Sequence, residues 1–211
     1  MNNNSSAPLR LRASALKSEQ LAGLILAGGE GRRFGGPKAF ARFDDGRTFL
    51  EVCAATLIGA GASPLVATLP PGTEDLQIDG LESTALPEPG MDMFASLVTG
   101  LRHLVEHPDW RTVALLPVDH PLVHSSSVSA LVDTAALAAI PSYRGKHGHP
   151  VCLVRSVAER ILSGDLAGPT LREVLRSVGA VDVDVDDPGV AANCNTPDAL
   201  RDALRPHDSE P

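Results

Sequence analysis

The sequence predicts a single α/β domain with a mostly parallel, mixed sheet and helices on both of its faces. Short β-like runs alternate with helical stretches, an order typical of parallel strands joined by helices. The first run, Leu21–Ala27, is continuously apolar, as expected of a strand buried on both faces. The chain has 211 residues, 43% of them hydrophobic, which is enough for one sizeable core.

The first half of the chain should contain three strands and two helices. Leu21–Ala27 ends at a glycine pair. Thr48–Ala60 begins with a capping box, Thr followed three residues later by Glu, and is therefore a helix. Pro64–Leu69 is a strand that stops at a Pro-Pro-Gly turn. Asp92–Glu106 has apolar residues at helical spacing, and Thr112–Pro117 is a third apolar strand.

The second half continues the alternation. The expected elements are a helix at Ser126–Ala138, short strands at Ala139–Ser142 and Gly148–Val154, a helix at Thr170–Val178, a strand at Val181–Val185 and a helix from Thr196. The helix at 170 opens with a second capping box, and Thr196 is an N-cap followed by proline. The Val-Asp alternation at 181–185 indicates an edge or half-exposed strand.

The composition excludes several classes of protein. Residues 1–19 are polar and without the apolar core of a signal peptide; we expect a disordered lead-in there, a domain at 20–204 and a tail at 205–211. No apolar run is long enough to span a membrane. Three widely separated cysteines favour the reducing cytoplasm. A net charge of −8 and seven aromatic residues argue against a nucleic-acid partner.

A glycine-rich loop, LAGGEGRRFGGPKAF, follows the first strand. It fails the Walker pattern because proline precedes the lysine, and it fails GxGxxG because phenylalanine holds the last position. Its Gly28, Gly29 and Gly31 would still let backbone N–H groups approach an anion. Arg33 and Lys38 would supply positive charge for phosphate oxygens. The loop therefore predicts a phosphate site.

A carboxylate follows the strand Thr112–Pro117. Ligands of parallel sheets bind beyond the carboxyl ends of the strands, and Asp119 stands at such an end. A carboxylate there is suited to Mg²⁺ held between phosphates. The neighbouring His120 is assigned no role, and the HGH triplet at 147–149 is not expected to bind zinc.

The loop pattern L-A-G-G-x-G-x-R-F-G-x-x-K resembles the signature of MobA/MocA-like nucleotidyltransferases, the guanylyl- and cytidylyltransferases of the molybdenum cofactor. The resemblance implies a three-layer α/β/α, Rossmann-like nucleotidyltransferase fold. It also implies Arg33, Lys38 and Asp119 as catalytic residues. The implied nucleotide-binding residues are Leu26, Ala27, Gly28, Gly29, Gly31, Arg33, Lys38 and Ser96.

Further segments resemble the same family in the same order. VDHP, with Val118 where the family usually has glycine, resembles its metal-binding turn at Asp119. The segment NCNTP resembles its terminal motif and implies Asn195 as a second Mg²⁺ ligand, with Asn193 as the alternative. The segment SYRGKHGHP resembles an acceptor-lining turn. It implies acceptor contacts from Arg144, Lys146 and His149.

The implied reaction is Mg²⁺-dependent transfer of a nucleoside monophosphate from a nucleoside triphosphate to a phosphorylated small molecule, with pyrophosphate release. Molybdopterin is the favoured acceptor, and a molybdoenzyme or its chaperone is a candidate partner. LAGG favours GTP, whereas the GMDMFASL and GHP segments favour CTP, so the base stays open. A sugar-1-phosphate acceptor and a non-catalytic nucleotide-binding module are the alternatives. Neither a nucleic acid nor a membrane is expected as a partner.

Overall fold

The computed structural model describes residues 20–29, 31, 36–73, 77–166 and 170–204. The strands are β1 (Leu21–Leu26), β2 (Leu65–Leu69), β3 (Glu82–Ala85), β4 (Thr112–Pro117), β5 (Ala138–Tyr143), β6 (Lys146–His147), β7 (Val151–Val154) and β8 (Val181–Asp184). The helices are α2 (Phe49–Gly59), α3 (Met93–Leu104), α4 (Ser125–Val132), α5 (Arg155–Ser163), α6 (Leu171–Ser177) and α7 (Pro197–Ala203), with 3-10 turns η2 (Lys38–Phe40) and η3 (Pro188–Ala191).

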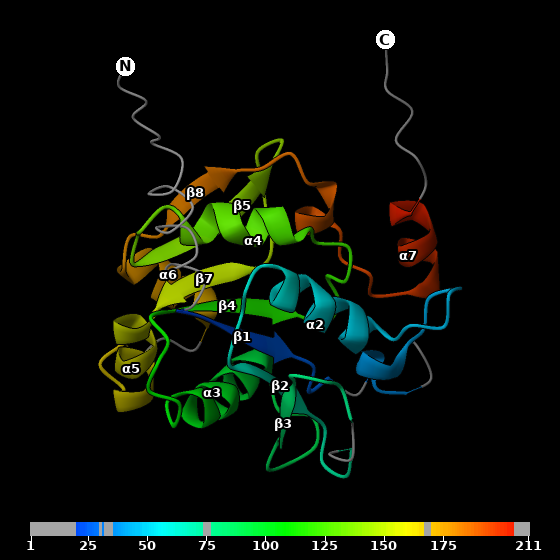
Figure 1. Ribbon diagram of the computed structural model, residues 1–211, viewed down its shortest axis with the longest axis horizontal. Helices are drawn as coiled ribbons and strands as arrows, with labels where there is room; N and C mark the ends of the chain where they lie inside the picture. The colour runs from blue at the N-terminus through cyan, green and yellow to red at the C-terminus, as the bar shows by residue number, and fades with distance from the viewer. Residues whose placement is uncertain (1–19, 30, 32–35, 74–76, 167–169, 205–211) are drawn as a thin grey trace, which may run out of the picture.

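These strands form one mixed sheet in the order β3-β2-β1-β4-β7-β5-β6, with β8 paired to β5 (Figure 1). The pairs β3-β2, β2-β1, β1-β4 and β5-β8 are parallel. The pairs β4-β7, β7-β5 and β5-β6 are antiparallel. The α/β class and the mixed sheet are therefore confirmed.

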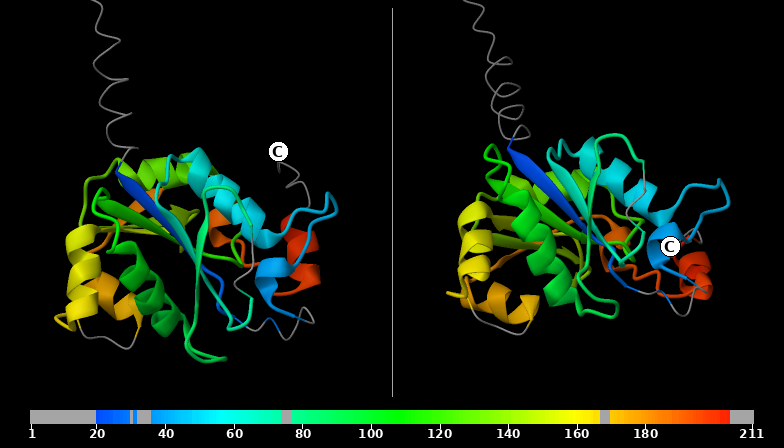
Figure 2. Two further views of the ribbon diagram at one scale, coloured as in Figure 1. Left: turned by 60° about the horizontal axis from the view of Figure 1, so that its bottom comes forward. Right: turned by 90° about the horizontal axis from the view of Figure 1, so that it is seen from below.

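Helices cover both faces of this sheet (Figure 2). One core contains α2, α4 and α7 side chains packed on the face that Leu21 and Ile25 of β1 present. The other core contains α3, α5 and α6 on the face of Ala22, Leu24 and Leu26. All six residues of β1 are buried, which explains why this strand reads as an uninterrupted apolar run.

Three details differ from the expectations. The helix expected at 126–138 ends at Val132, because Thr134 turns its hydroxyl onto the Leu131 carbonyl and Ala135 adopts φ +54°. The edge strand β3 is too short and polar to show a strand pattern. Helix α5 starts directly after β7 without a side-chain cap, so its beginning leaves no sequence signal.

The terminal segments 1–19 and 205–211, expected to be a lead-in and a tail, lie outside the described residues. In the part of the chain that the structure describes, no helix is long and apolar enough to cross a membrane.

Candidate active site

The site lies where β1 and β4 end side by side. Leu26 of β1 is in register with Pro117 of β4, and the N–H of Val118 extends this ladder by donating to the Leu26 carbonyl at 3.1 Å. The two strands are parallel, so the glycine-rich segment and the acidic turn leave the sheet at the same edge.

A cavity of about 330 Å³ opens at this edge. It is lined by Leu26, Gly28, Gly29, Gly31, Lys38, Met91, Asp92, Met93, Ser96, Pro117, Val118, Asp119 and Asn195. The structure thus gathers most of the site residues expected from the sequence around one space. Ala27 is buried just behind it and donates its N–H to Thr68 of β2. Arg33 lies outside the described residues.

Lys38 links the glycine-rich segment after β1 to Asp119 and Asn195. Its Nζ atom lies 3.7 Å from Oδ2 of Asp119 and donates a hydrogen bond to Oδ1 of Asn195. The side chains of Lys38 and Asp119 are only 16% and 18% exposed, so solvent screens their attraction less than at an open surface. A cation therefore already lies against the oxygen atoms of both residues expected to bind metal.

Backbone and side-chain bonds fix the acidic turn. The Asp119 carbonyl accepts the N–H of Cys194 at 2.7 Å, and the His120 N–H donates to Pro117. The Asn193 amide nitrogen donates to Oδ2 of Asp119 at 3.0 Å. Asn195 supplies its oxygen toward Lys38 while Asn193 supplies a donor to Asp119. Of the two asparagines considered as a metal ligand, Asn195 is the one whose side-chain oxygen contacts a cation, the Lys38 ammonium.

The cavity floor is closely packed beneath Gly28. A Cβ atom there would lie 2.2 Å from Cδ1 of Leu86 and 3.3 Å from Oγ of Ser96. The hydroxyl of Ser96, on α3, is held 2.6 Å from the hydroxyl of Thr68. Gly31 has φ +58°, and a Cβ there would lie 2.0 Å from the Gly36 carbonyl oxygen. Gly31 requires glycine because the obstructing atoms belong to the backbone, whereas a Cβ atom at Gly28 would require the buried Leu86 side chain to shift.

The donor atoms at this edge fit Mg²⁺. Asp119 offers a carboxylate and Asn195 an amide oxygen, which are hard ligands that magnesium prefers. Their common contact with the Lys38 ammonium shows that the two oxygens converge on a point where positive charge is stabilised.

A second, larger cavity of about 1140 Å³ adjoins the first. The two share Leu26, Asp92 and Met93 as lining residues. The rings of His120 and His149 meet edge to face in it, with centroids 4.8 Å apart. Within the described residues, the Nδ1 atom of each is buried without a hydrogen-bond partner.

Burial determines the charge of this histidine pair. It lowers the pKa of His149 to about 4, assisted by the nearby His120, and it lowers the pKa of His120 as well. Both rings are therefore neutral at pH 7, so each can offer a ligand either a donor or an acceptor nitrogen.

Of the three residues expected at the acceptor, only His149 lines this second cavity. Arg144 lies in the turn between β5 and β6, and Lys146 is the exposed first residue of β6; neither lines either cavity. The Arg144 guanidinium stacks 5.3 Å from the ring centroid of Tyr143. The structure does not bring these two side chains to the site.

The three cysteines are buried free thiols. Burial raises the pKa of Cys53, raises that of Cys152 to about 12, and raises that of Cys194 to about 11. A protonated, enclosed thiol is a poor nucleophile, and we assign these residues to packing.

Sequence reasoning missed several residues of the two cavities. Met91, Asp92 and Met93 line the first, and His120 lines the second. Asp92 did carry a signal, because it caps α3 by accepting the N–H of Ala95 at 2.7 Å. A capping role does not itself place a residue in a cavity.

Comparison with known proteins identifies the family. The family model of the MobA-like NTP transferase domain matches residues 23–183. The chain belongs to this family. The family resemblance inferred from the loop and turn motifs is thus confirmed. The family assignment also confirms the expectation that the protein is a nucleotidyltransferase.

Individual relatives agree with this assignment. A probable molybdenum cofactor guanylyltransferase of Geobacillus sp. (strain WCH70) is 55% identical over 38 residues, which cover 18% of this chain. That match spans only 19% of the relative's length.

Two solved structures share the fold. Rv0371c of Mycobacterium tuberculosis H37Rv, also solved in complex with manganese, has a TM-score of 0.70 at 23% identity, covering 88% of this chain and 97% of that one. The molybdopterin-guanine dinucleotide biosynthesis protein A of Archaeoglobus fulgidus has a TM-score of 0.63 at 20% identity, covering 86% and 96%.

Proposed function

We propose that the protein transfers a nucleoside monophosphate from a nucleoside triphosphate to molybdopterin and releases pyrophosphate, in the cytoplasm and with Mg²⁺. One observation carries the proposal: Lys38, Asp119 and Asn195 converge on the cavity at the ends of β1 and β4. Phosphoryl-type transfer needs such a grouping, because catalysis rests mainly on positioning and on stabilising charge.

Each part of the grouping has a distinct task. The backbone at Gly28, Gly29 and Gly31 receives the phosphates without Cβ obstruction. Lys38 balances the charge that grows on departing pyrophosphate. Asp119 and Asn195 would hold Mg²⁺, which when bound neutralises phosphate oxygens at the reacting centre. The manganese complex of Rv0371c supports a divalent ion in a protein of this fold.

GTP is the donor that we favour. The loop reads Leu-Ala-Gly-Gly at 26–29, the form that resembles the guanylyl branch. The relative from Geobacillus carries the name of a guanylyltransferase. CTP, which the segments around Ser96 and His149 favour, is the competing donor in the test below.

The larger cavity is the space that we assign to the acceptor. It adjoins the nucleotide cavity through Leu26, Asp92 and Met93, so two bound molecules would meet there. The neutral rings of His120 and His149 line this cavity and offer a pterin an uncharged aromatic surface to pack against. A phosphate acceptor is already ionised at neutral pH, so no strong base is required.

Pyrophosphate release measured with purified protein tests the proposal. The assay combines Mg²⁺, each of GTP, CTP, ATP and UTP, and either molybdopterin or a sugar-1-phosphate. We expect release with GTP and molybdopterin together. If CTP were the one nucleotide that supported pyrophosphate release, the donor would be CTP and not GTP. If pyrophosphate were released with the sugar-1-phosphate and not with molybdopterin, the acceptor would be a sugar phosphate. Nucleotide binding without turnover on any acceptor would overturn the enzyme assignment in favour of a binding module.

A further inference from the structure

A cluster of three potential metal ligands lies away from the nucleotide site, where the C-terminal end of α3 meets the edge strand β3. The Nε2 atom of His103 lies 2.9 Å from Oε2 of Glu82, and the Nε2 atom of His107 lies 3.4 Å from the same oxygen. One ligand atom from each of the three residues lies within 4.8 Å of the others. The three side chains are 29%, 33% and 50% exposed for His103, His107 and Glu82, so an ion in solvent can reach them.

We propose that Glu82, His103 and His107 form a binding site for a divalent transition-metal ion, and that Zn²⁺ suits it best. Two imidazoles and one carboxylate form a recognised zinc ligand set, with water in the fourth position. For metal–ligand bonds of about 2.0 Å, the edge of a tetrahedron is roughly 3.3 Å. The two contacts with Glu82 lie close to that length, and all three ligand atoms lie within 4.8 Å of one another, which bounds the side-chain adjustment that an ion would require.

Chain geometry brings the two histidines together. They are four residues apart, which places them on the same side of a helical turn. His103 lies in the last turn of α3, and the turn continues beyond it because the His107 N–H donates to the Leu104 carbonyl.

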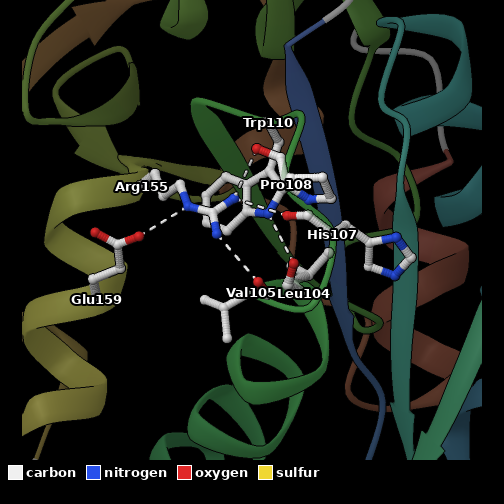
Figure 3. A network of polar contacts seen from close by, with 7 residues as sticks. All are labelled: Leu104, Val105, His107, Pro108, Trp110, Arg155 and Glu159. Atoms are coloured by element: carbon white, nitrogen blue, oxygen red, sulfur yellow. Dashed lines mark hydrogen bonds and ion pairs between the residues drawn. The ribbon is translucent and has the colours of Figure 1, made fainter.

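The segment that carries His107 is firmly held. The Arg155 guanidinium of α5 donates to the His107 carbonyl at 2.8 Å and to the Val105 carbonyl at 3.1 Å. It also lies 4.8 Å from the ring centroid of Trp110, whose indole N–H donates to Leu104 (Figure 3). In Figure 3 the His107 ring points away from Arg155. The backbone is thus fixed while the imidazole remains available, as a preorganised ligand requires.

The carboxylate ligand is also in a suitable chemical state. A hydrogen bond with His103 lowers the pKa of Glu82, so this carboxylate is ionised at neutral pH. Metal binding needs deprotonated ligands. A bound ion would tie the edge strand β3 to α3, the same helix whose beginning supplies Met93 and Ser96 to the nucleotide cavity. This site is independent of the proposed reaction.

The test is a titration of the full-length chain, without a polyhistidine tag, with ZnCl₂ in excess Mg²⁺. Calorimetry gives the stoichiometry, and thermal unfolding gives the stabilisation that a ligand of the folded state produces. We expect one tight Zn²⁺ per chain and a raised Tm. The variants His103→Gln and His107→Gln should lose this binding, and Glu82→Gln should weaken it at least about tenfold. Co²⁺ bound to the wild type should give intense visible absorption bands, which indicate a low coordination number. These bands should be absent in His107→Gln.

Two control variants test whether Zn²⁺ binds at Glu82, His103 and His107 and not elsewhere on the chain. His147→Gln removes an exposed histidine that pairs with Asp182 at 3.2 Å, and it should bind Zn²⁺ as the wild type does. Asp119→Asn alters the nucleotide site and should also retain binding. The proposal is overturned if the wild type binds no Zn²⁺, if His103→Gln and His107→Gln both bind it unchanged, or if only Asp119→Asn loses it. Tm values without added metal show whether each variant is folded.

Discussion

The ammonium nitrogen of Lys38 lies 3.7 Å from the carboxylate of Asp119 and also contacts the amide oxygen of Asn195. Lys38 follows the first strand, Asp119 the fourth, and Asn195 precedes the last helix. The protein therefore places its own cation between the two oxygens assigned to the metal. This arrangement makes Lys38 a partner of the phosphates and also a competitor of the metal ion.

Replacing the carboxylate should stop turnover without unfolding the chain. We expect Asp119→Asn to lower kcat on the order of 100-fold or more, because charge stabilisation at the reacting phosphate is lost. Pyrophosphate release measures the effect, and circular dichroism checks the fold. Asp109→Asn, in the exposed loop before the opposite end of β4, is the matched control and should be as active as the wild type. If Asp119→Asn released pyrophosphate as fast as Asp109→Asn, the assignment of Asp119 as a metal ligand would be wrong.

Removing the ammonium should have opposite effects on the two ligands. Lys38→Met should weaken GTP binding by about 10- to 100-fold, the range expected for losing a hydrogen bond from a charged group. Without nucleotide, the same variant should bind Mn²⁺ about fivefold more tightly, because the competing ion pair contributes about 1 kcal/mol. Calorimetry measures the first effect and electron paramagnetic resonance the second.

Lys146→Met is the control for both measurements, since Lys146 is exposed as the first residue of β6. Unchanged GTP affinity in Lys38→Met would contradict its phosphate role. Unchanged or weaker Mn²⁺ binding would show that the ammonium and the ion do not compete.

Two neighbouring glycines should respond differently to the same methyl group. Gly28→Ala should lower the free energy of unfolding by about 1–3 kcal/mol, because the new Cβ would overlap Leu86, itself a buried side chain. Gly29→Ala should leave it nearly unchanged, since no atom lies within 4 Å of a Cβ there. Urea unfolding compares the two variants, and equal midpoints would mean that the cavity floor is not packed as described.

The buried histidine pair should make stability depend on pH. The pKa of His149 is about 4 in the folded chain, whereas an unfolded histidine titrates near about 6.5. Between these values the unfolded chain binds more protons, so the free energy of unfolding decreases as the pH falls. We expect a loss of roughly 2 kcal/mol from His149 between pH 6.5 and pH 4.5.

Urea unfolding at these two pH values tests this dependence. His149→Gln cannot titrate and should show a smaller loss than the wild type. His147→Gln, an exposed neighbour, should keep the wild-type dependence. Identical pH dependence in His149→Gln would show that folding does not lower the pKa of this histidine.

The site residues that the sequence could predict share one property: they follow strands whose apolar character marks them clearly. Gly28 and Asp119 leave β1 and β4, and adjacent parallel strands bring such residues to one edge. Lys38 could be assigned to the phosphates because it lies in the glycine-rich loop that follows β1, whereas Asn195 could be placed only through the resemblance, because it follows no recognisable strand directly. Their contact depends on tertiary packing, which a linear pattern does not encode.

The acceptor region shows the limit of the same reasoning. Arg144, Lys146 and His149 lie within six consecutive residues, yet only His149 faces a cavity. The β5–β6 hairpin carries Arg144 and Lys146 outward, whereas the His149 N–H is bonded to the Val190 carbonyl in η3. The presence of basic residues near a turn does not predict whether the turn faces a cavity or the solvent. The position of Asp92 in the cavity wall likewise depends on how α3, which it caps, packs against β1.

The backbone bond from the Cys194 N–H to the Asp119 carbonyl has a consequence for how this site can change. It connects the two segments that carry Asp119 and Asn195 without using either side chain. This backbone hydrogen bond can therefore form whatever side chains stand at positions 119 and 195. Substitution can alter the charge at this edge, for instance through Asn195→Asp, while the segments keep their spacing. Ion preference can thus be re-engineered at this edge without redesigning the fold.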